Sequence, residues 1–228
     1  AGEFVTILGK NGIGKSTLLR TLTKVQEQIS GDVFLQQKKI QSYSLKELST
    51  TISLVLTEKL PESQLTVFEL VALGRQPYTN WIGKLQENDI ERITSALKLT
   101  ETDDLAQKHF HELSDGQLQR VLIARALAQD TKIIMLDEPT AHLDMHHTIK
   151  IFQLLKKLSK ETEKTIIITT HEVNLAINAA DQLILLTENN VICGTKNELI
   201  AKDSFNALFP SDIVNFNASL EQFIIKKN

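Results

Sequence analysis

The chain has 228 residues, of which 42% are hydrophobic and 23% charged, with 25 Lys and Arg against 28 Asp and Glu. The formal net charge of -3 disfavours a protein that binds nucleic acid through a strongly basic surface. The single cysteine, Cys193, excludes an internal disulfide and favours a reducing compartment, and the longest apolar runs fall far short of the roughly 18 residues of a membrane-spanning helix.

The first predicted strand covers residues 4–8 and leads directly into the loop GKNGIGKST, residues 9–17. Apolar residues at helical spacing follow the loop, so the local order is strand, glycine-rich loop, helix. This is the P-loop pattern G-x-x-x-x-G-K-S in the context that phosphate binding requires. The backbone N–H groups of such a loop and the positive end of the following helix face the phosphates.

Individual residues of this loop have predicted roles. We expect Lys15 to reach the β- and γ-phosphates of a nucleotide and to assist catalysis, and the Ser16 hydroxyl to bind Mg²⁺. The residues expected to bind the nucleotide are Gly9, Asn11, Gly12, Gly14, Lys15, Ser16 and Thr17. A chance glycine loop at a helix start is disfavoured, because the complete pattern is present in its strand-to-helix context.

Strand patterns continue along the chain at residues 32–35, 51–56, 132–136, 165–169 and 182–186. From about residue 61 to residue 130 the apolar spacing is mostly helical, and a further helix is predicted at about 146–158. Strands that alternate with helices favour a mostly parallel sheet covered on both sides. We therefore predict an α/β fold with a P-loop NTPase core, residues 1–59 and 131–228, and an inserted α-helical subdomain, residues 60–130.

The apolar strand at residues 133–136 ends in an acidic pair, Asp137 and Glu138. Because sites in parallel sheets lie at the carboxyl ends of the strands, we expect Asp137 to project toward the same Mg²⁺ as Ser16. Glu138 is the candidate general base for the attacking water. An acidic pair after a strand is by itself more often a solvated turn, but its combination with the P-loop favours the catalytic interpretation.

Residues 113–120, LSDGQLQR, open a helical stretch upstream of the acidic pair. They resemble the LSGGQ signature of ABC-type ATPases. Residues 141–144, AHLD, are similar to the D-loop of that family, and His171 is similar to its switch histidine. The resemblance spans nearly the whole chain. A narrower likeness, in residues 71–78, 113–116 and 138–144, is to the ATPase subunits of importers for iron-siderophore, haem and cobalamin complexes.

The resemblance implies a homodimer in which each ATP lies between the P-loop of one subunit and the signature of the other. Ser114 and the N–H groups at the start of its helix form a second anion site. The residues implied to bind the ATP of the partner are Ser114, Gly116, Gln117 and Asp144. His171 is implied to contact the γ-phosphate and to hold Glu138 in register, which makes Lys15, Glu138 and His171 the catalytic candidates.

The resemblance also implies partners and a location. The chain would power uptake of an iron-siderophore, haem or cobalamin-like complex with ATP and Mg²⁺, as a peripheral subunit at the cytoplasmic face of the cell membrane. Its partners would be integral-membrane permease subunits and, through them, a solute-binding protein. Nucleic acid is not expected as a partner. Two alternatives stay open: a soluble ABC-type ATPase of DNA repair or translation, and a nucleotide-binding module with impaired hydrolysis. The motifs alone do not separate import from export.

Three features depart from the family pattern. Asp115 stands where the signature usually has glycine, although an acidic residue suits a helix N-terminus. Glu58 is the nearest match to the family's Q-loop glutamine, and we expect it as a third Mg²⁺ ligand. Only eight residues precede Gly9, so we expect that N-terminal strands are missing, together with the aromatic residue that would stack on adenine.

Two further groups of residues have weaker functional interpretations. His142, His146 and His147 could suggest a metal site, but solvated or interface histidines are favoured, because no cysteine or carboxylate lies at metal-site spacing. The loop at residues 77–83 contains Trp81, the only tryptophan. This loop is interpreted either as folded onto its own subdomain or as part of a surface for a membrane partner.

Overall fold

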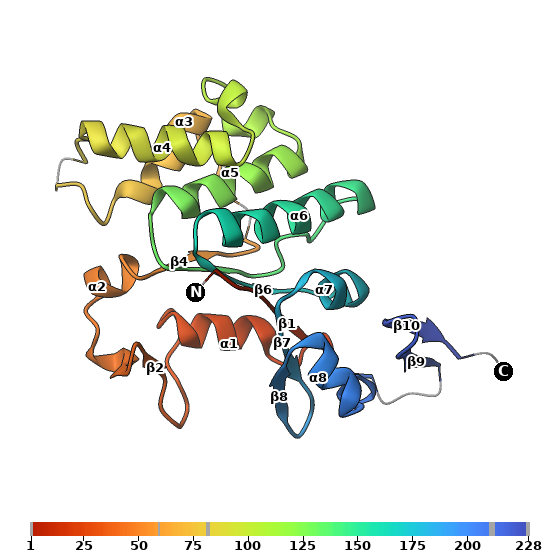
Figure 1. Ribbon diagram of the computed structural model, residues 1–228. Coiled ribbons are helices and arrows are strands. Elements are labelled where there is room, and N and C mark those ends of the chain that lie inside the picture. Colours follow the sequence, from red (N-terminus) through yellow and green to blue (C-terminus); the bar gives the residue numbers. More distant parts are fainter. Residues whose placement is uncertain (1, 59, 81–82, 210–212, 227–228) are drawn as a thin grey trace.

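The computed structural model describes the chain except for residues 1, 59, 81–82, 210–212 and 227–228. Its centre is a six-stranded sheet in the order β4-β5-β6-β1-β7-β8 (Figure 1). The strands are β1 (Phe4–Gly9), β4 (Ile52–Val55), β5 (Ile133–Leu136), β6 (Thr165–Thr169), β7 (Gln182–Leu186) and β8 (Val191–Gly194). β4, β5, β6, β1 and β7 pair in parallel, and β8 pairs antiparallel to β7 at one edge. The predicted α/β fold with a mostly parallel sheet is confirmed.

The sheet separates two apolar cores. All six residues of β1 are buried, as is typical of a parallel strand covered on both faces. Successive side chains of a strand point to opposite faces, and in β5 Ile134 packs into one core while Met135 packs into the other. Helix α1 (Lys15–Leu22) and helix α2 (Leu45–Ser49) contribute to the smaller core. Helices α6 (Met145–Glu161) and α7 (Val173–Ala179) contribute to the larger core on the opposite face.

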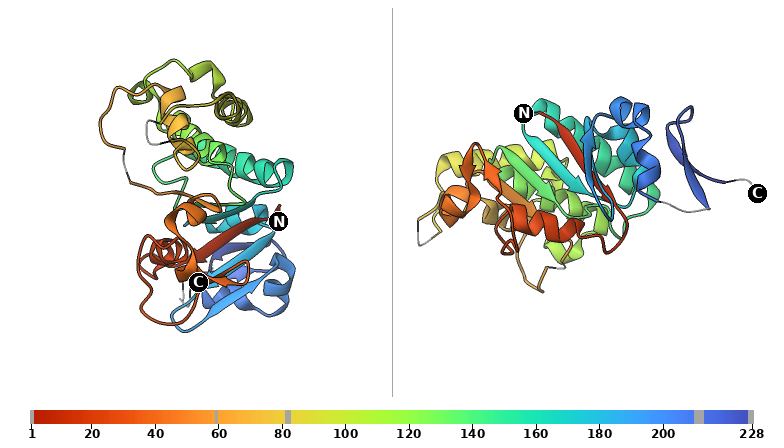
Figure 2. Two further views of the ribbon diagram at one scale, coloured as in Figure 1. Left: turned by 90° about the vertical axis from the view of Figure 1, so that its left-hand side faces the viewer. Right: turned by 90° about the horizontal axis from the view of Figure 1, so that it is seen from below.

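Three helices form a layer beyond the sheet, at the top of Figure 1 and of the left-hand view of Figure 2. They are α3 (Val67–Ala72), α4 (Glu87–Leu99) and α5 (Asp115–Ala128), joined by short 3₁₀ turns at residues 73–75, 103–105 and 110–112. α5 packs on α3 and α4 and also on β4 of the sheet. Because α5 contacts both parts, the exact subdomain boundary at residue 130 stays a prediction.

A buried ion pair ties this helical layer together. Arg75, only 3% exposed, donates from Nε to the Asp89 carboxylate at 2.8 Å and from Nη1 to the backbone oxygen of Ala128 at 2.8 Å. The hydrogen bond from the Gln86 backbone N–H lowers the pKa of Asp89 below its usual value. Desolvation opposes this shift, and the Arg75 guanidinium adds to it. One side chain therefore connects the turn after α3 to α4 and to the end of α5.

The C-terminal part adds elements that the sequence patterns did not predict. Helix α8 (Lys196–Ala201) is followed by a hairpin of β9 (Val214–Asn217) and β10 (Gln222–Ile225). The hairpin packs through Phe216 and Phe223 on Phe205, and the rings of Phe205 and Phe216 stack with centroids 4.4 Å apart.

A second small hairpin pairs β2 (Phe34–Leu35) with β3 (Lys38–Lys39). None of the helices in the described part of the chain has the length and apolar character needed to cross a membrane.

Candidate active site

The glycine-rich loop joins the end of β1 to the start of α1. Gly12 and Gly14 have φ angles of 78° and 104°, in the left-handed region that favours glycine, and Gly14 caps the N-terminus of α1. A Cβ atom at either position would meet nothing within 4 Å, so the backbone of the loop faces open space. The requirement for glycine here is conformational, and it leaves the loop backbone accessible to a phosphate.

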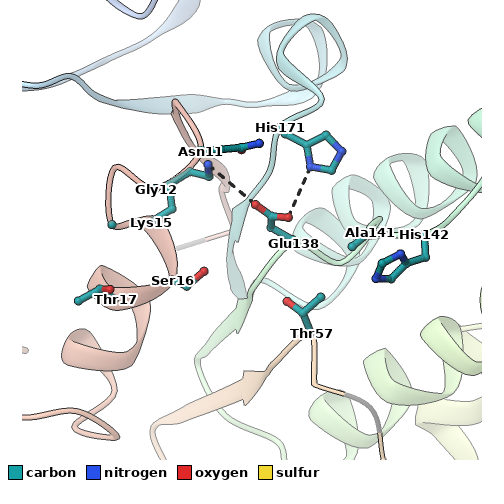
Figure 3. A pocket seen from close by; sticks show the side chains of 11 residues that line it. Asn11, Gly12, Lys15, Ser16, Thr17, Thr57, Glu138, Ala141, His142 and His171 are labelled. Carbon is teal, nitrogen blue, oxygen red and sulfur yellow. Dashed lines mark ion pairs between the residues drawn. The ribbon is translucent and has the colours of Figure 1, made fainter.

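A cavity of about 640 Å³ lies over this loop (Figure 3). It is bounded by the loop and α1 on one side and by the segments that follow β4, β5 and β6 on the other. The lining residues are Asn11, Gly12, Gly14, Lys15, Ser16, Thr17, Thr57, Glu138, Ala141, His142 and His171. The structure thus brings the predicted loop residues, with the exception of Gly9, together with Glu138 and His171, which are far apart in sequence. Gly9 does not line the cavity and lies against Leu186 and Ile13 instead.

Lys15 supplies the positive charge of the cavity. Its side chain is only 4% exposed, and Nζ donates to the backbone oxygens of Gly9 at 3.0 Å and Lys10 at 3.3 Å. Nζ also lies 3.8 Å from Oε1 of Glu138. The ammonium group is therefore held beneath the loop by backbone carbonyl groups and lies beside a carboxylate.

Ser16, in the first turn of α1, and Asp137, directly after β5, lie in contact. The Ser16 hydroxyl donates to Oδ1 of Asp137 at 2.9 Å, and the Thr169 hydroxyl donates to the same oxygen at 2.7 Å. Asp137 is 4% exposed, so its carboxylate is almost completely buried. Hydroxyl and carboxylate oxygens are the ligands that Mg²⁺ prefers, and this pair of oxygens fits such an ion.

Glu138 lies between the two other charged groups of the cavity. Oε2 of Glu138 is 3.5 Å from Nδ1 of His171, while Oε1 faces Lys15 (Figure 3). The φ angle of Glu138 is 43°, an uncommon conformation for a residue other than glycine. Its backbone N–H donates to the Thr169 hydroxyl at 2.9 Å, which helps to hold that conformation. After β5, Glu138 therefore lines the cavity, whereas Asp137 contacts it through the hydroxyl of Ser16.

Glu58 does not join this group, and here the sequence interpretation needs correction. Its carboxylate pairs with Nη2 of Arg20 at 2.8 Å, one helical turn beyond Ser16 on α1, and its side chain is 67% exposed. The neighbouring residue Thr57 lines the cavity instead and donates its hydroxyl to the backbone oxygen of Asp137 at 2.8 Å. We did not predict Thr57, and its position directly after a strand end was the only signal in the sequence.

Ser114, Gly116 and Gln117 lie outside the cavity, at the start of α5. Ser114 caps the helix: its hydroxyl accepts from the Gln117 backbone N–H at 3.4 Å, and the Gln117 side chain accepts from the Ser114 N–H at 3.1 Å. Asp115 follows in the first turn and is exposed, a position that suits the helix dipole. Ser114 and Asp115 at this helix start are exposed, whereas Gly116 is buried.

Asp144 also lies outside the cavity, at the start of α6. Its carboxylate caps the helix by accepting from the backbone N–H of His147 at 2.8 Å. This bond and a second one from the His147 ring hold the pKa of Asp144 below its usual value. A role for Asp144, Ser114, Gly116 and Gln117 in nucleotide binding stays a prediction that needs a second copy of the chain.

The weaker candidates have other surroundings. No group of three or more His, Cys, Asp or Glu side chains capable of holding a metal ion occurs in the described ranges. His147 pairs with Asp144, and the ring of His109 stacks on that of His111 with centroids 5.5 Å apart. Trp81, proposed for a partner surface, lies outside the described residues.

Comparison with protein families gives a match over most of the P-loop and helical regions. The family model described as ABC transporter matches residues 1–141. An ABC transporter ATP-binding protein of Methanocaldococcus jannaschii is 38% identical over 228 residues, which cover 100% of this chain and 79% of that protein. The petrobactin import ATP-binding protein FpuD of Bacillus anthracis is 38% identical over 89% of this chain and 74% of its own length. The iron(3+)-hydroxamate import ATP-binding protein FhuC of Bacillus subtilis is 38% identical over 92% and 79%.

Solved structures are also similar. An inward-facing ABC transporter assigned to the metal-chelate type superposes with a TM-score of 0.79 at 30% identity, covering 98% of this chain and 84% of that one. A dimeric ATP-binding cassette in a post-hydrolysis state, bound to ADP and Pi, superposes with a TM-score of 0.71 at 33% identity, covering 86% of each chain.

Proposed function

The chain belongs to the ABC transporter family as an ATP-binding, ATP-hydrolysing subunit, and we propose that it powers uptake of an iron-siderophore or a related metal-chelate complex. The similarity to import proteins for petrobactin and iron(3+)-hydroxamate supports this substrate class. The likeness to a transporter assigned to the metal-chelate type supports it independently. Haem and cobalamin complexes belong to the same class of bulky metal chelates and stay within the proposal.

One observation carries the chemistry: Glu138 lies between Lys15 and His171 on the wall of the P-loop cavity. In the proposed reaction the loop N–H groups and Lys15 bind the ATP phosphates and stabilise the charge that develops on them. Glu138 accepts the proton of the attacking water, and His171 orients the carboxylate through its Nδ1 atom. Hydrolysis is therefore catalysed mainly by positioning and by charge.

Ser16 and Asp137 would hold the Mg²⁺ that accompanies ATP, since their oxygens already lie 2.9 Å apart at the edge of the cavity. A bound Mg²⁺ would neutralise phosphate charge. The Thr169 hydroxyl contributes by fixing the Asp137 carboxylate at 2.7 Å. We propose no direct role for Glu58, because its carboxylate is engaged by Arg20.

The active unit in this proposal is a pair of chains. Ser114, Gly116, Gln117 and Asp144 lie outside the P-loop cavity of their own chain, and Ser114 and Asp144 are exposed to a second copy. The positive end of the α5 dipole suits the γ-phosphate of the ATP that this copy holds. ATP binding then closes the pair, and hydrolysis reopens it.

The motion of the pair is proposed to act on integral-membrane permease subunits at the cytoplasmic face of the membrane, with a solute-binding protein delivering the chelate. The test is to purify the chain with its co-expressed permease and to measure uptake of ferric hydroxamate, haem and cobalamin in cells. Lys15→Ala is expected to abolish uptake of one of these while leaving the complex assembled. Unchanged uptake of all three with the variant would contradict the proposal.

A further inference from the structure

His147 lies between two segments that the proposed function assigns to the partner's ATP. It is in the first turn of α6, three residues after Asp144, and its side chain is 46% exposed. On its other side the ring contacts the start of α5: a methyl group placed on Gly116 would lie 2.7 Å from Cδ2 of His147. The imidazole therefore packs directly on the backbone of the helix that carries Ser114 and Gln117.

Two hydrogen bonds fix the ring to Asp144. The His147 backbone N–H lies 2.8 Å from Oδ1 of Asp144, and Nδ1 of the ring lies 2.8 Å from Oδ2. An ionised carboxylate only accepts hydrogen bonds, so Nδ1 carries the proton and donates it. With both carboxylate oxygens engaged by one residue, the orientation of the ring and that of Asp144 are set together.

The starts of α5 and α6 are supported mainly by different elements. Helix α5 packs chiefly on α3 and α4, whereas α6 packs on α7 and the sheet. A cleft of about 380 Å³ lies between α5 and α6, and Gly116, Arg120, His147 and Lys150 are among the residues that line it. Because of this cleft, the contact between His147 and Gly116 directly links two helix starts that other elements support separately.

We propose that His147 is a positioning residue that holds Asp144 and the start of the signature helix α5 in register, so that both engage the ATP of the partner subunit together. This inference rests on the proposed function, in which each chain completes the site of the other. A displacement of about 1 Å in such a site is enough to lower a rate about 100-fold. Removal of the link is expected to weaken closure of the pair without affecting the chain's own P-loop.

Three substitutions separate the parts of this link, each made in a Glu138→Gln parent, which we expect to bind ATP with little turnover. His147→Leu keeps bulk against Gly116 but removes the donor to Asp144, and His147→Ala removes both. His147→Asn keeps an amide nitrogen at the place of Nδ1 and is the conservative rescue. His111→Ala is the matched control, because His111 is an exposed histidine outside the cavity and outside the starts of α5 and α6.

The measurement is ATP-dependent dimerisation of the full chain by analytical ultracentrifugation. The affinity for ADP and the melting temperature of each variant are measured as well. We expect the Leu and Ala variants to need about tenfold more protein to dimerise, about 1.4 kcal/mol. We expect the Asn variant and the His111 control to stay within about twofold of the parent. ADP binding is expected to be unchanged in all of them, since His147 does not line the P-loop cavity.

Three results would overturn the inference. A parent that does not dimerise with ATP contradicts the proposed function and this inference with it. A parent that dimerises while the Leu and Ala variants dimerise equally well contradicts the inference alone. Loss of ADP binding in the Leu and Ala variants would show a general structural role instead.

Discussion

The Ser16 hydroxyl donates a hydrogen bond of 2.9 Å to Oδ1 of Asp137, a residue 121 positions later in the chain. The bond joins the first turn of α1 to the end of β5, so it links the glycine-rich loop to the acidic pair. Thr169, at the end of the adjacent strand β6, donates to the same oxygen at 2.7 Å. Three strand-end or helix-start segments therefore meet at one carboxylate oxygen.

Asp137→Asn tests whether the charge at this point holds Mg²⁺. The asparagine Oδ1 atom can still accept from Ser16 and Thr169, so the fold is expected to persist with an unchanged melting temperature. The lost negative charge should raise the Mg²⁺ concentration needed for activity and lower the rate of ATP hydrolysis about 100-fold. A titration of the rate against Mg²⁺ measures both effects, and an unchanged Mg²⁺ requirement would argue against the assignment.

Glu138→Gln tests the proposed general base. The amide keeps the size of the side chain but accepts no proton at neutral pH, so the hydrolysis rate should fall by about 100-fold or more while ATP still binds. The matched control is Glu172→Gln, which changes the carboxylate 3.4 Å from the opposite nitrogen of His171. The control should lower the rate far less, and equal effects of the two substitutions in a phosphate-release assay would mean that Glu138 has no special role.

Thr57 and Glu58 give a direct comparison between neighbouring side chains. Thr57→Val removes the hydroxyl that donates to the Asp137 backbone oxygen at 2.8 Å while keeping the shape of the residue. Glu58→Gln weakens only the exposed pair with Arg20, and exposed ion pairs contribute about 0–1 kcal/mol. The valine variant should therefore slow ATP hydrolysis more than the glutamine variant. If Glu58→Gln slowed ATP hydrolysis more than Thr57→Val, Glu58 would again be a candidate Mg²⁺ ligand.

Much of the fold was predictable because its strongest signals are local. The strands at residues 165–169 and 182–186 have the predicted bounds, since each is a short apolar run buried in a parallel sheet. The edge strand β8 and the hairpin of β9 and β10 were not predicted. The residues of β8 alternate between exposed and half-buried, and those of β9 and β10 are mostly half-buried, so none of the three is a continuous buried apolar run. These strands are held by contacts outside their own sequence, the pairing of β8 with β7 and the packing of Phe216 on the ring of Phe205.

The candidate site was predictable where a motif fixes both residue type and backbone conformation. The loop glycines are such a case, because the φ angles of Gly12 and Gly14 favour this residue. Thr57 was missed and Glu58 was misplaced, because the choice between them depends on which side chain points into the cavity after β4. Sequence spacing does not determine that direction; the nearby Arg20 does, by pairing with Glu58.

The pKa of Asp144 offers a readout of the His147 contact that does not require a dimer. The backbone N–H of His147 lowers this pKa most and the ring adds to the effect, so the folded value lies below the ordinary 3.8. The stabilisation from this carboxylate is therefore present above about pH 3.8 and is lost as the pH falls through the folded pKa. In His147→Leu the pKa should rise part of the way to 3.8, because the backbone bond remains. Carboxyl NMR titration measures it, and an unchanged value would show that the ring bond is not formed in solution.

Gly74 belongs to residues 71–78, one of the stretches that resemble importer ATPases. It lies so close to the backbone of α5 that a side chain would not fit there. A methyl group at this position would lie 2.3 Å from the backbone oxygen of Arg125 and 3.3 Å from the backbone nitrogen of Gln129, both at the end of α5. These are backbone atoms that cannot rotate away, so α3 and α5 would have to separate, and the neighbouring Arg75 would lose its geometry to Asp89 and Ala128. Gly74→Ala should lower the free energy of unfolding by about 1–3 kcal/mol.

Leu73→Ala is the matched control for Gly74→Ala, because it truncates the side chain at the adjacent position, which is 38% exposed. Chemical denaturation should show the smaller loss of stability for the control, although the control removes apolar side-chain atoms and Gly74→Ala adds a methyl group. If the control were equally destabilising, the close approach of Gly74 to Arg125 would not be what holds α3 against α5. A loss of stability in Gly74→Ala alone would indicate that residue 74 must be glycine for the packing of the helical layer. It would not indicate a role in the chemistry of the cavity.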